Sequence, residues 1–288
     1  DEVICYYHSN CFDGMAAAWV VSKKFPNAKF IPAQYGNKQL ETNIMQDCFE
    51  NANINQHYVI VDFSFSRDLM IQMANKAKSI IVLDHHKTAQ ANCEGLDFCR
   101  FDMDESGASL AWKHYFPSIE VPVLVNYIAD RDLWKFKLSD SRYVNAYIQS
   151  FPIDIKEYEQ LYLILESETG FNIAVSAGEA VERYKDSMVK AMCANAKPYK
   201  MDAFLIPIVN STLLFSEVGH YMCQQSYDWL GGNKPAFAAS FFIRQDGKKQ
   251  WSLRSISDFD VSAIAKKFGG GGHKNAAGFE EDLLENQK

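Results

Sequence analysis

Short apolar runs alternate with helical patterns through the first half of the chain. The apolar runs are rich in β-branched and aromatic residues and are predicted to be strands, at residues 3–7, 29–35, 58–63 and 79–83. Helical patterns cover residues 14–24, 67–77, 105–115 and 121–129. Strands that alternate with helices predict an α/β domain, with a mainly parallel sheet and helices on both faces.

The pattern changes beyond residue 150. Residues 152–197 are predicted to be helical, with a long amphipathic helix over 178–196 that Pro198 ends. The remaining segments predict a strand, a helix, a hairpin around Asp246-Gly247 and a short helix, at residues 203–210, 217–225, 236–255 and 261–268. We therefore expect two lobes: a domain over 1–150, a helical connector over 151–199, and a smaller α/β domain over 200–288.

Charge and cysteine content indicate which kinds of partner and which cellular compartment are to be expected. The net charge of −7 disfavours a grip on long duplex nucleic acid, because phosphate neutralisation needs a basic excess. No apolar run is long enough to cross a bilayer. The seven cysteines include no C-x-x-C pair, which favours reduced thiols and a cytoplasmic location. A homodimer is compatible with these numbers.

Polar residues follow three of the predicted strands, where parallel sheets bind ligands. His8 and Asp13 follow the first strand, although a loop histidine and a helix-capping aspartate explain them equally well. Asp62 closes an apolar strand, and a helix cap or a salt bridge is the favoured local explanation. Asp84-His85-His86 follows the next strand, and there metal binding is favoured over a surface histidine pair.

Another acidic group follows the helix predicted over 121–129. Asp130-Arg131-Asp132 is either a solvated charge cluster or part of the same site. A mixed set of histidines and aspartates suits Mn²⁺, Mg²⁺ or another divalent ion. Two such ions would clamp the attacking and leaving oxygens of a displacement at phosphorus.

A glycine run, FGGGGHKNAAGF over residues 268–279, stands near the end of the chain. Its backbone N–H groups, with His273, Lys274 and a helix that starts at Asn275, predict a phosphate-binding nest. A flexible linker is the alternative, but a linker would carry more serine. Arg254 is a candidate second phosphate ligand, and a surface strand residue is its alternative.

The order of these motifs resembles the DHH superfamily of phosphoesterases. Asp84-His85-His86 after a strand, preceded by His8, Asp13-Gly14 and Asp62, resembles the catalytic domain of that superfamily. The GGGGHKNAAGF run resembles the hallmark of its associated C-terminal domain. The resemblance spans nearly the whole chain.

The resemblance implies a role for each candidate residue. It implies one or two Mn²⁺ ions bound by five residues, with Asp62 between the ions, and it favours Asp130 over Asp132: His8, Asp13, Asp62, His85 and Asp130. It implies that His86 contacts the scissile phosphate while Asp84 supports the site. It also implies that the C-terminal domain holds substrate across an interdomain cleft, through Arg254, Gly270, Gly271, Gly272, His273 and Lys274.

One position departs from the pattern of the superfamily. Cys11 stands where the first of two motif aspartates is usual. A thiolate is a soft ligand for Mn²⁺, so a water, another side chain or a weaker metal site is favoured over ligation by sulfur. Metal stoichiometry therefore stays open.

The predicted function is a divalent-metal-dependent phosphoesterase. Its expected substrates are small nucleotides, dinucleotides or very short oligonucleotides, hydrolysed by metal-activated water. The alternatives are an exopolyphosphatase or pyrophosphatase-like hydrolase, and a non-catalytic nucleotide sensor if Cys11 disables the metal centre. A redox switch at Cys11 is a further hypothesis.

Overall fold

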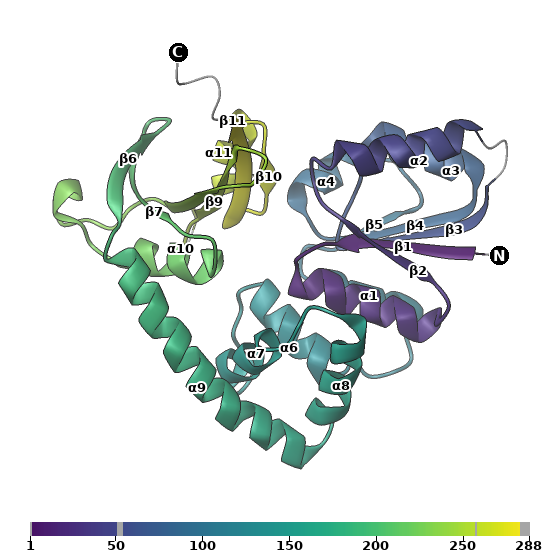
Figure 1. Cartoon of the computed structure of the whole chain (residues 1–288), viewed down its shortest axis with the longest axis horizontal. Coiled ribbons are helices and arrows are strands. Elements are labelled where there is room, and N and C mark those ends of the chain that lie inside the picture. The colour runs from purple at the N-terminus through teal and green to yellow at the C-terminus, as the bar shows by residue number, and fades with distance from the viewer. Residues whose placement is uncertain (1, 51–53, 257, 283–288) are drawn as a thin grey trace. The chain divides into compact units, whose positions relative to one another are not determined.

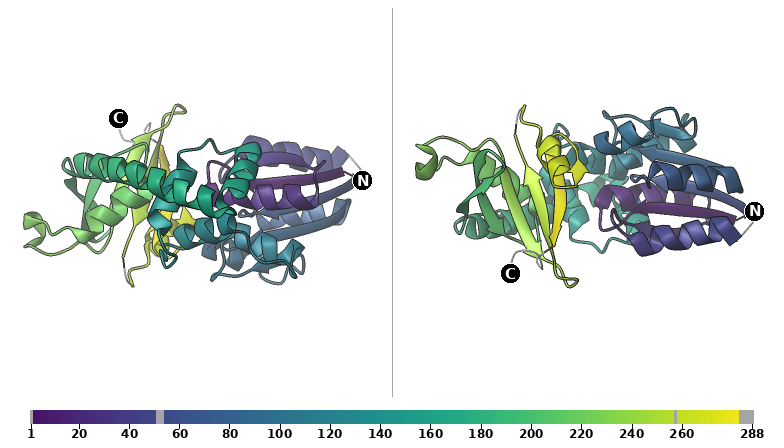
Figure 2. Two further views of the ribbon diagram at one scale, coloured as in Figure 1. Left: turned by 90° about the horizontal axis from the view of Figure 1, so that it is seen from below. Right: turned by 90° about the horizontal axis from the view of Figure 1, so that it is seen from above.

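The computed structural model describes residues 2–50, 54–256 and 258–282 and divides into two compact units, Asp1–Glu182 and Arg183–Lys288 (Figure 1). The division falls inside a single 26-residue helix, α9 (Glu168–Cys193), which runs uninterrupted in Figure 2. It does not fall at the ends of the predicted connector, because Tyr158 and Leu161 belong to the core of the first unit. Within the described residues, no helix combines the length and hydropathy needed to cross a membrane.

A five-stranded parallel sheet forms the centre of the first unit, which confirms the predicted parallel arrangement and adds a short fifth strand. Its order is β2-β1-β3-β4-β5, and each neighbouring pair is parallel. The strands are β1 (Glu2–His8), β2 (Lys29–Ala33), β3 (Ile54–Val61), β4 (Ala77–Asp84) and β5 (Cys99–Phe101). Because all strands are parallel, the carboxyl ends of β1, β3 and β4 lie at one edge of the sheet.

Helices cover both faces of this sheet (Figure 1). Alternate strand residues face opposite ways: Cys5 and Leu83 join one core, and Ile4 and Val82 join the other. The first core is closed by α1 (Phe12–Lys24), α5 (Gly107–Tyr115), α6 (Val123–Asp132), α7 (Ser141–Gln149) and α8 (Ile155–Leu165). The opposite face carries α2 (Lys38–Glu50), α3 (Arg67–Lys76) and α4 (Lys87–Asn92).

The second unit is built on a six-stranded mixed sheet. Its order is β10-β11-β9-β8-β7-β6, with only the β7–β8 pair parallel among the described strands. The strands are β6 (Lys197–Met201), β7 (Phe204–Asn210), β8 (Ala238–Ile243), β9 (Lys248–Arg254), β10 (Gly271–Gly272) and β11 (Ala276–Asp282). Helices α10 (Phe215–Gln224) and α11 (Val261–Lys267) pack on opposite faces, and a short 3-10 helix, η1, covers Asp228–Leu230.

Two element predictions differ from the structure in ways that affect the site. The helix expected to end at Ala129 continues to Asp132 as α6. The helix expected to start at Asn275 is wrong, because strand β11 begins at Ala276 and pairs with β9. A third difference is helix α2, which the sequence analysis does not predict. Among its residues only Ile44 and Cys48 are buried, so its apolar pattern is weak.

Candidate metal centre

The candidate residues gather at the carboxyl edge of the first unit's sheet. His8 ends β1, Asp62 follows β3, and Asp84 ends β4 with His85 directly after it. Asp13 reaches the same edge from the first turn of α1. Apolar strands thus deliver polar side chains to the position where ligands bind in open parallel sheets.

Asp62 lies between two imidazoles. Its Oδ1 is 3.1 Å from His85 Nε2, and its Oδ2 is 3.4 Å from His8 Nδ1. Burial by itself raises the pKa of Asp62, but the two histidines outweigh it and hold this pKa well below its usual range. Asp62 also has a left-handed backbone, with φ of 52°, while its N–H donates to the Leu83 carbonyl. Neighbouring strands therefore enforce a conformation that costs energy, as is common at functional sites.

His85 faces three carboxylates. Its Nε2 is 3.1 Å from Asp62 Oδ1, 3.5 Å from Asp132 Oδ2 and 3.8 Å from Asp13 Oδ2. Burial lowers the pKa of His85, but the hydrogen bond to Asp62 and the charges of Asp132 and Asp13 raise it overall to about 10. Burial also raises the pKa of both Asp13 and Asp132, and repulsion adds to the rise, from Asp132 and Asp62 at Asp13 and from Asp62 at Asp132. The cluster carries more negative charge than one histidine neutralises.

Asp84 shapes the turn that carries both histidines. Its Oδ1 accepts from the His85 N–H at 2.7 Å and from His86 Nδ1 at 2.7 Å. Its Oδ2 accepts from the Ser64 hydroxyl at 2.6 Å. Because a carboxylate only accepts here, the proton of His86 lies on Nδ1, and Nε2 is the acceptor or ligand atom of the neutral ring.

Asp13 lies in the cluster around His85 and also accepts hydrogen bonds from the backbone of α5. Its Oδ2 accepts from the Gly107 N–H at 2.5 Å, and its Oδ1 accepts from the Ala108 N–H at 3.1 Å. It therefore caps the start of α5, not the start of its own helix. A Cβ at Gly107 would lie 2.5 Å from Asp62 Cβ and 2.9 Å from Asp13 Oδ2, so only glycine fits this position.

Asp130, which the sequence favours as a ligand, and Asp132 make different contacts in the structure. Asp130 Oδ1 accepts from the Lys137 N–H at 2.9 Å, and its Oδ2 accepts from the Leu138 N–H at 3.2 Å. Its carboxylate is thus committed to the loop after α6. Asp132, two residues later, is the one that lies beside His85.

The donor atoms form two adjacent groups that fit divalent cations. Among the described residues, His8, Asp62 and His86 form one group and Asp13, His85 and Asp132 form another, each within 4.8 Å. His8 Nδ1 and Asp62 Oδ2 are buried and face each other without a hydrogen-bond partner. Buried polar atoms rarely stay unpaired, so a cation between such donors explains the arrangement. The oxygen and nitrogen donors suit Mn²⁺, Mg²⁺ or a related ion.

Two further residues border the centre. Cys11 is partly buried, and burial together with the charges of Asp62 and Asp132 raises the pKa of its thiol well above the usual range. The ring of Tyr35 lies 5.7 Å from that of His8 and 5.9 Å from that of His86, and its side chain is 44% exposed. No motif marks Tyr35 in the sequence, whereas Asp132 is a sequence candidate that ranks below Asp130.

The glycine run in the second unit is mostly a packed structure. The N–H groups of Gly269 and Gly270 donate to carbonyls at the end of α11, and Gly271 and Gly272 pair with β11. A Cβ at Gly270 would lie 2.0 Å from the Gly278 carbonyl oxygen. The amides of the first two glycines are therefore already used within the unit, and phosphate binding by the run stays a prediction.

The other candidate phosphate ligands of the second unit have partners of their own. Arg254 donates through Nε and a terminal nitrogen to the Ser216 hydroxyl, at 3.2 and 3.1 Å. Lys274 pairs with Asp258 at 2.9 Å. The His273 N–H donates to the Ala276 carbonyl in the turn between β10 and β11.

Comparisons with known proteins bear on both units. Residues 227–287 match the model of the DHHA1 domain. The chain is 27% identical to the uncharacterized protein R106 of Acanthamoeba polyphaga mimivirus, over 96% of this chain and 67% of that protein. It is 23% identical to the oligoribonuclease NrnB of Bacillus subtilis (strain 168), over 94% of this chain and 71% of that protein.

Solved structures share the fold. The crystal structure of RecJ in complex with Mn²⁺ from Thermus thermophilus matches with a TM-score of 0.52 and 14% identity. The match covers 98% of this chain and 50% of RecJ. At this identity the likeness is one of fold.

Proposed function

We propose that this chain, which belongs to the DHH superfamily, is a divalent-metal-dependent phosphoesterase that hydrolyses small nucleotides, dinucleotides or very short oligonucleotides. The observation that carries the proposal is the pair of adjacent donor groups joined through Asp62 at the carboxyl edge of the sheet. The similarity to an oligoribonuclease and the fold shared with Mn²⁺-bound RecJ support the same chemistry.

The proposed ligands are the residues of the two donor groups other than His86. They replace Asp130 by Asp132 and are His8, Asp13, Asp62, His85 and Asp132. Bound ions would supply a nucleophilic water near neutral pH and offset charge on the phosphate. The negative excess of the cluster favours cations and disfavours a direct approach by phosphate without them.

His86 is the proposed contact to the reacting phosphate. Asp84 holds its Nδ1–H, so Nε2 is oriented by a buried carboxylate that is itself held by Ser64. Burial lowers the pKa of His86, but Asp84 outweighs burial and raises it, so a protonated ring can donate to a phosphate oxygen. In the second unit, we propose Arg254, His273 and Lys274 as phosphate contacts, with Gly271 and Gly272 beside them.

Release of phosphate or nucleotide from a substrate panel tests the proposal. The panel holds a linear dinucleotide, a cyclic dinucleotide, a 3′-phosphorylated nucleotide, polyphosphate and pyrophosphate, each with Mn²⁺ and with EDTA. We expect Mn²⁺-dependent cleavage of a nucleotide substrate, lost in His85→Ala and retained in His114→Ala, whose side chain is exposed on α5. Cleavage of polyphosphate alone would replace the proposal with a polyphosphatase. Binding of nucleotide without any turnover would replace it with a sensor.

A further inference from the structure

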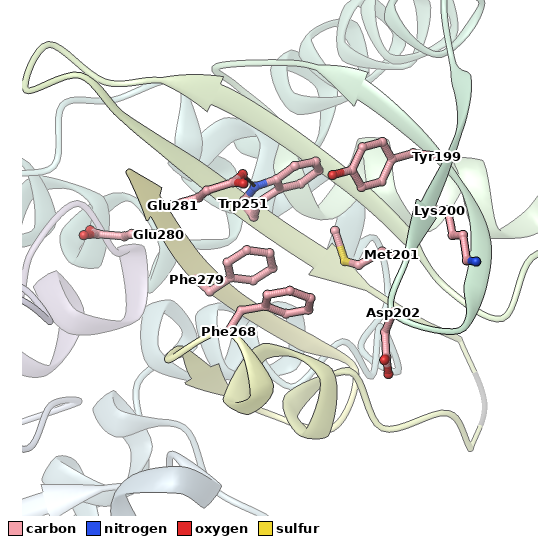
Figure 3. Close-up of a pocket in the computed structure, with 9 residues that line it drawn as sticks. All are labelled: Tyr199, Lys200, Met201, Asp202, Trp251, Phe268, Phe279, Glu280 and Glu281. Carbon is pink, nitrogen blue, oxygen red and sulfur yellow. Dashed lines mark hydrogen bonds between the residues drawn. The ribbon is translucent and has the colours of Figure 1, made fainter. Parts of the chain in front are cut away.

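A cavity of about 340 Å³ lies within the second unit (Figure 3). Its lining residues all belong to Arg183–Lys288: Tyr199, Lys200, Met201, Asp202, Trp251, Phe268, Phe279, Glu280 and Glu281. Cavities of roughly 300–1,000 Å³ that combine apolar walls with a few polar groups are typical of small-ligand sites.

The cavity lies next to the C-terminal end of α11. The helix ends at Lys267, and Gly269 turns the chain back with φ of 79°. Phe268 therefore projects beyond the helix and stacks on Phe279 of β11, with ring centroids 4.7 Å apart and planes at 17°.

An aromatic series lines the opening. Trp251 stacks near Phe279 at 5.8 Å, and the ring of Tyr199 lies 5.4 Å from Trp251. Trp251 and Phe279 are 1% and 5% exposed and form the floor, whereas Phe268 and Tyr199 are 43% and 37% exposed and form the walls. Exposed aromatic walls over a fixed aromatic floor suit a flat ring.

The polar groups point to a ligand with N–H donors. Glu281 accepts from Trp251 Nε1–H at 2.9 Å, which uses only part of the accepting capacity of the carboxylate. Figure 3 shows this carboxylate at the indole edge of Trp251, while that of Glu280 points away. Glu280 instead pairs with Arg244 and Lys248. The remaining accepting capacity of the Glu281 carboxylate suits amino or ring N–H groups.

We propose that this cavity binds a nucleobase, which contacts Phe268 and Tyr199 with its faces and donates to Glu281 from an amino or ring N–H group. The site shares no residue with the proposed metal ligands. It would allow the second unit to bind the base of a nucleotide. Its connection to a nucleotide substrate rests on the proposed function, but base binding itself does not.

Nucleoside binding to the full chain in EDTA tests this site without hydrolysis. Calorimetry would compare guanosine, adenosine and cytidine with N6,N6-dimethyladenosine, whose base has no N–H group. We expect saturable binding of an N–H-bearing nucleoside, weakened about tenfold or more by Phe268→Ala or Tyr199→Ala, as base stacking on aromatic rings predicts. We expect Glu281→Gln to weaken adenosine but not the dimethyl analogue.

Matched variants serve as controls. Leu205→Ala removes a side chain as exposed as Phe268, at 43%, outside the cavity lining, and Glu280→Gln changes the carboxylate that points away. Both should bind like the wild type, and so should His85→Ala, which separates this site from the metal centre. Three results would overturn the proposal: no nucleoside binds, binding ignores both wall variants, or N-acetyltryptophanamide binds as tightly as any nucleoside and marks a protein-docking pocket.

Discussion

At the scale of single residues, two aspartates that are two positions apart make different contacts. Asp130 accepts two loop N–H groups, and Asp132 lies 3.5 Å from His85. We expect Asp132→Ala to weaken Mn²⁺ binding strongly. It should leave the metal-free protein equally or more stable, because it removes repulsion from a cluster in which Asp13 and Asp132 both have raised pKa values.

The partner variant should behave in the opposite way. Asp130→Ala leaves two N–H groups without their acceptor and should cost about 1–3 kcal/mol of unfolding free energy. Urea unfolding in EDTA and Mn²⁺ titration by calorimetry measure both effects. Equal loss of Mn²⁺ affinity with no loss of stability in Asp130→Ala would return Asp130 to the ligand set.

The raised pKa of His85 predicts a pH dependence for the metal-free protein. Its folded pKa is about 10 against 6.5 for the free side chain, so the folded state binds the extra proton between these values. Stability from this group is fully present below pH 6.5 and is lost as pH rises toward 10. Unfolding midpoints in EDTA, measured from roughly neutral to mildly alkaline pH, should therefore fall more steeply for wild type than for His85→Ala. Parallel slopes for the two proteins would contradict the assignment.

At the scale of elements, α5 packs closely against the residues of the candidate metal centre. We expect Gly107→Ala to displace Asp13 and Asp62, since the added Cβ would lie 2.5 Å from Asp62 Cβ. The overpacking should cost about 1–3 kcal/mol and should also lower Mn²⁺ affinity. Ser109→Ala, which removes one side of the α5 capping box, should cost stability alone. Unchanged metal binding in Gly107→Ala would show that the backbone of α5 can shift freely.

The elements also show what sequence could and could not predict. Strand ends were predictable, because the apolar runs before His8, Asp62 and Asp84 end where polar residues begin. The choice between Asp130 and Asp132 depended on where α6 ends, and residues two apart on a helix point to different sides. The pairing of Gly271 and Gly272 with β11 could not be predicted from the sequence, because residue identity does not reveal a backbone partner.

At the scale of the whole molecule, the two units have separate cores. Trp251 and Leu253 anchor one core of the second unit, and Trp19 anchors the largest core of the first. Every proposed metal ligand lies before Glu182, and every residue of the aromatic cavity lies after Arg183. Each binding function should therefore be carried by one unit alone, because domains with their own cores can fold independently.

Separate expression of the two units tests this division of labour. We expect residues 1–182 to bind Mn²⁺ and residues 183–288 to bind none, as measured by the electron paramagnetic resonance signal of free Mn²⁺. The first fragment should lose binding on His85→Ala, which guards against adventitious sites on its acidic surface. Hydrolysis should be weak or absent in either fragment, because the proposed phosphate contacts Arg254 and His273 belong to the second. Full activity in the first fragment alone would show that the second unit selects substrates without contributing to their cleavage.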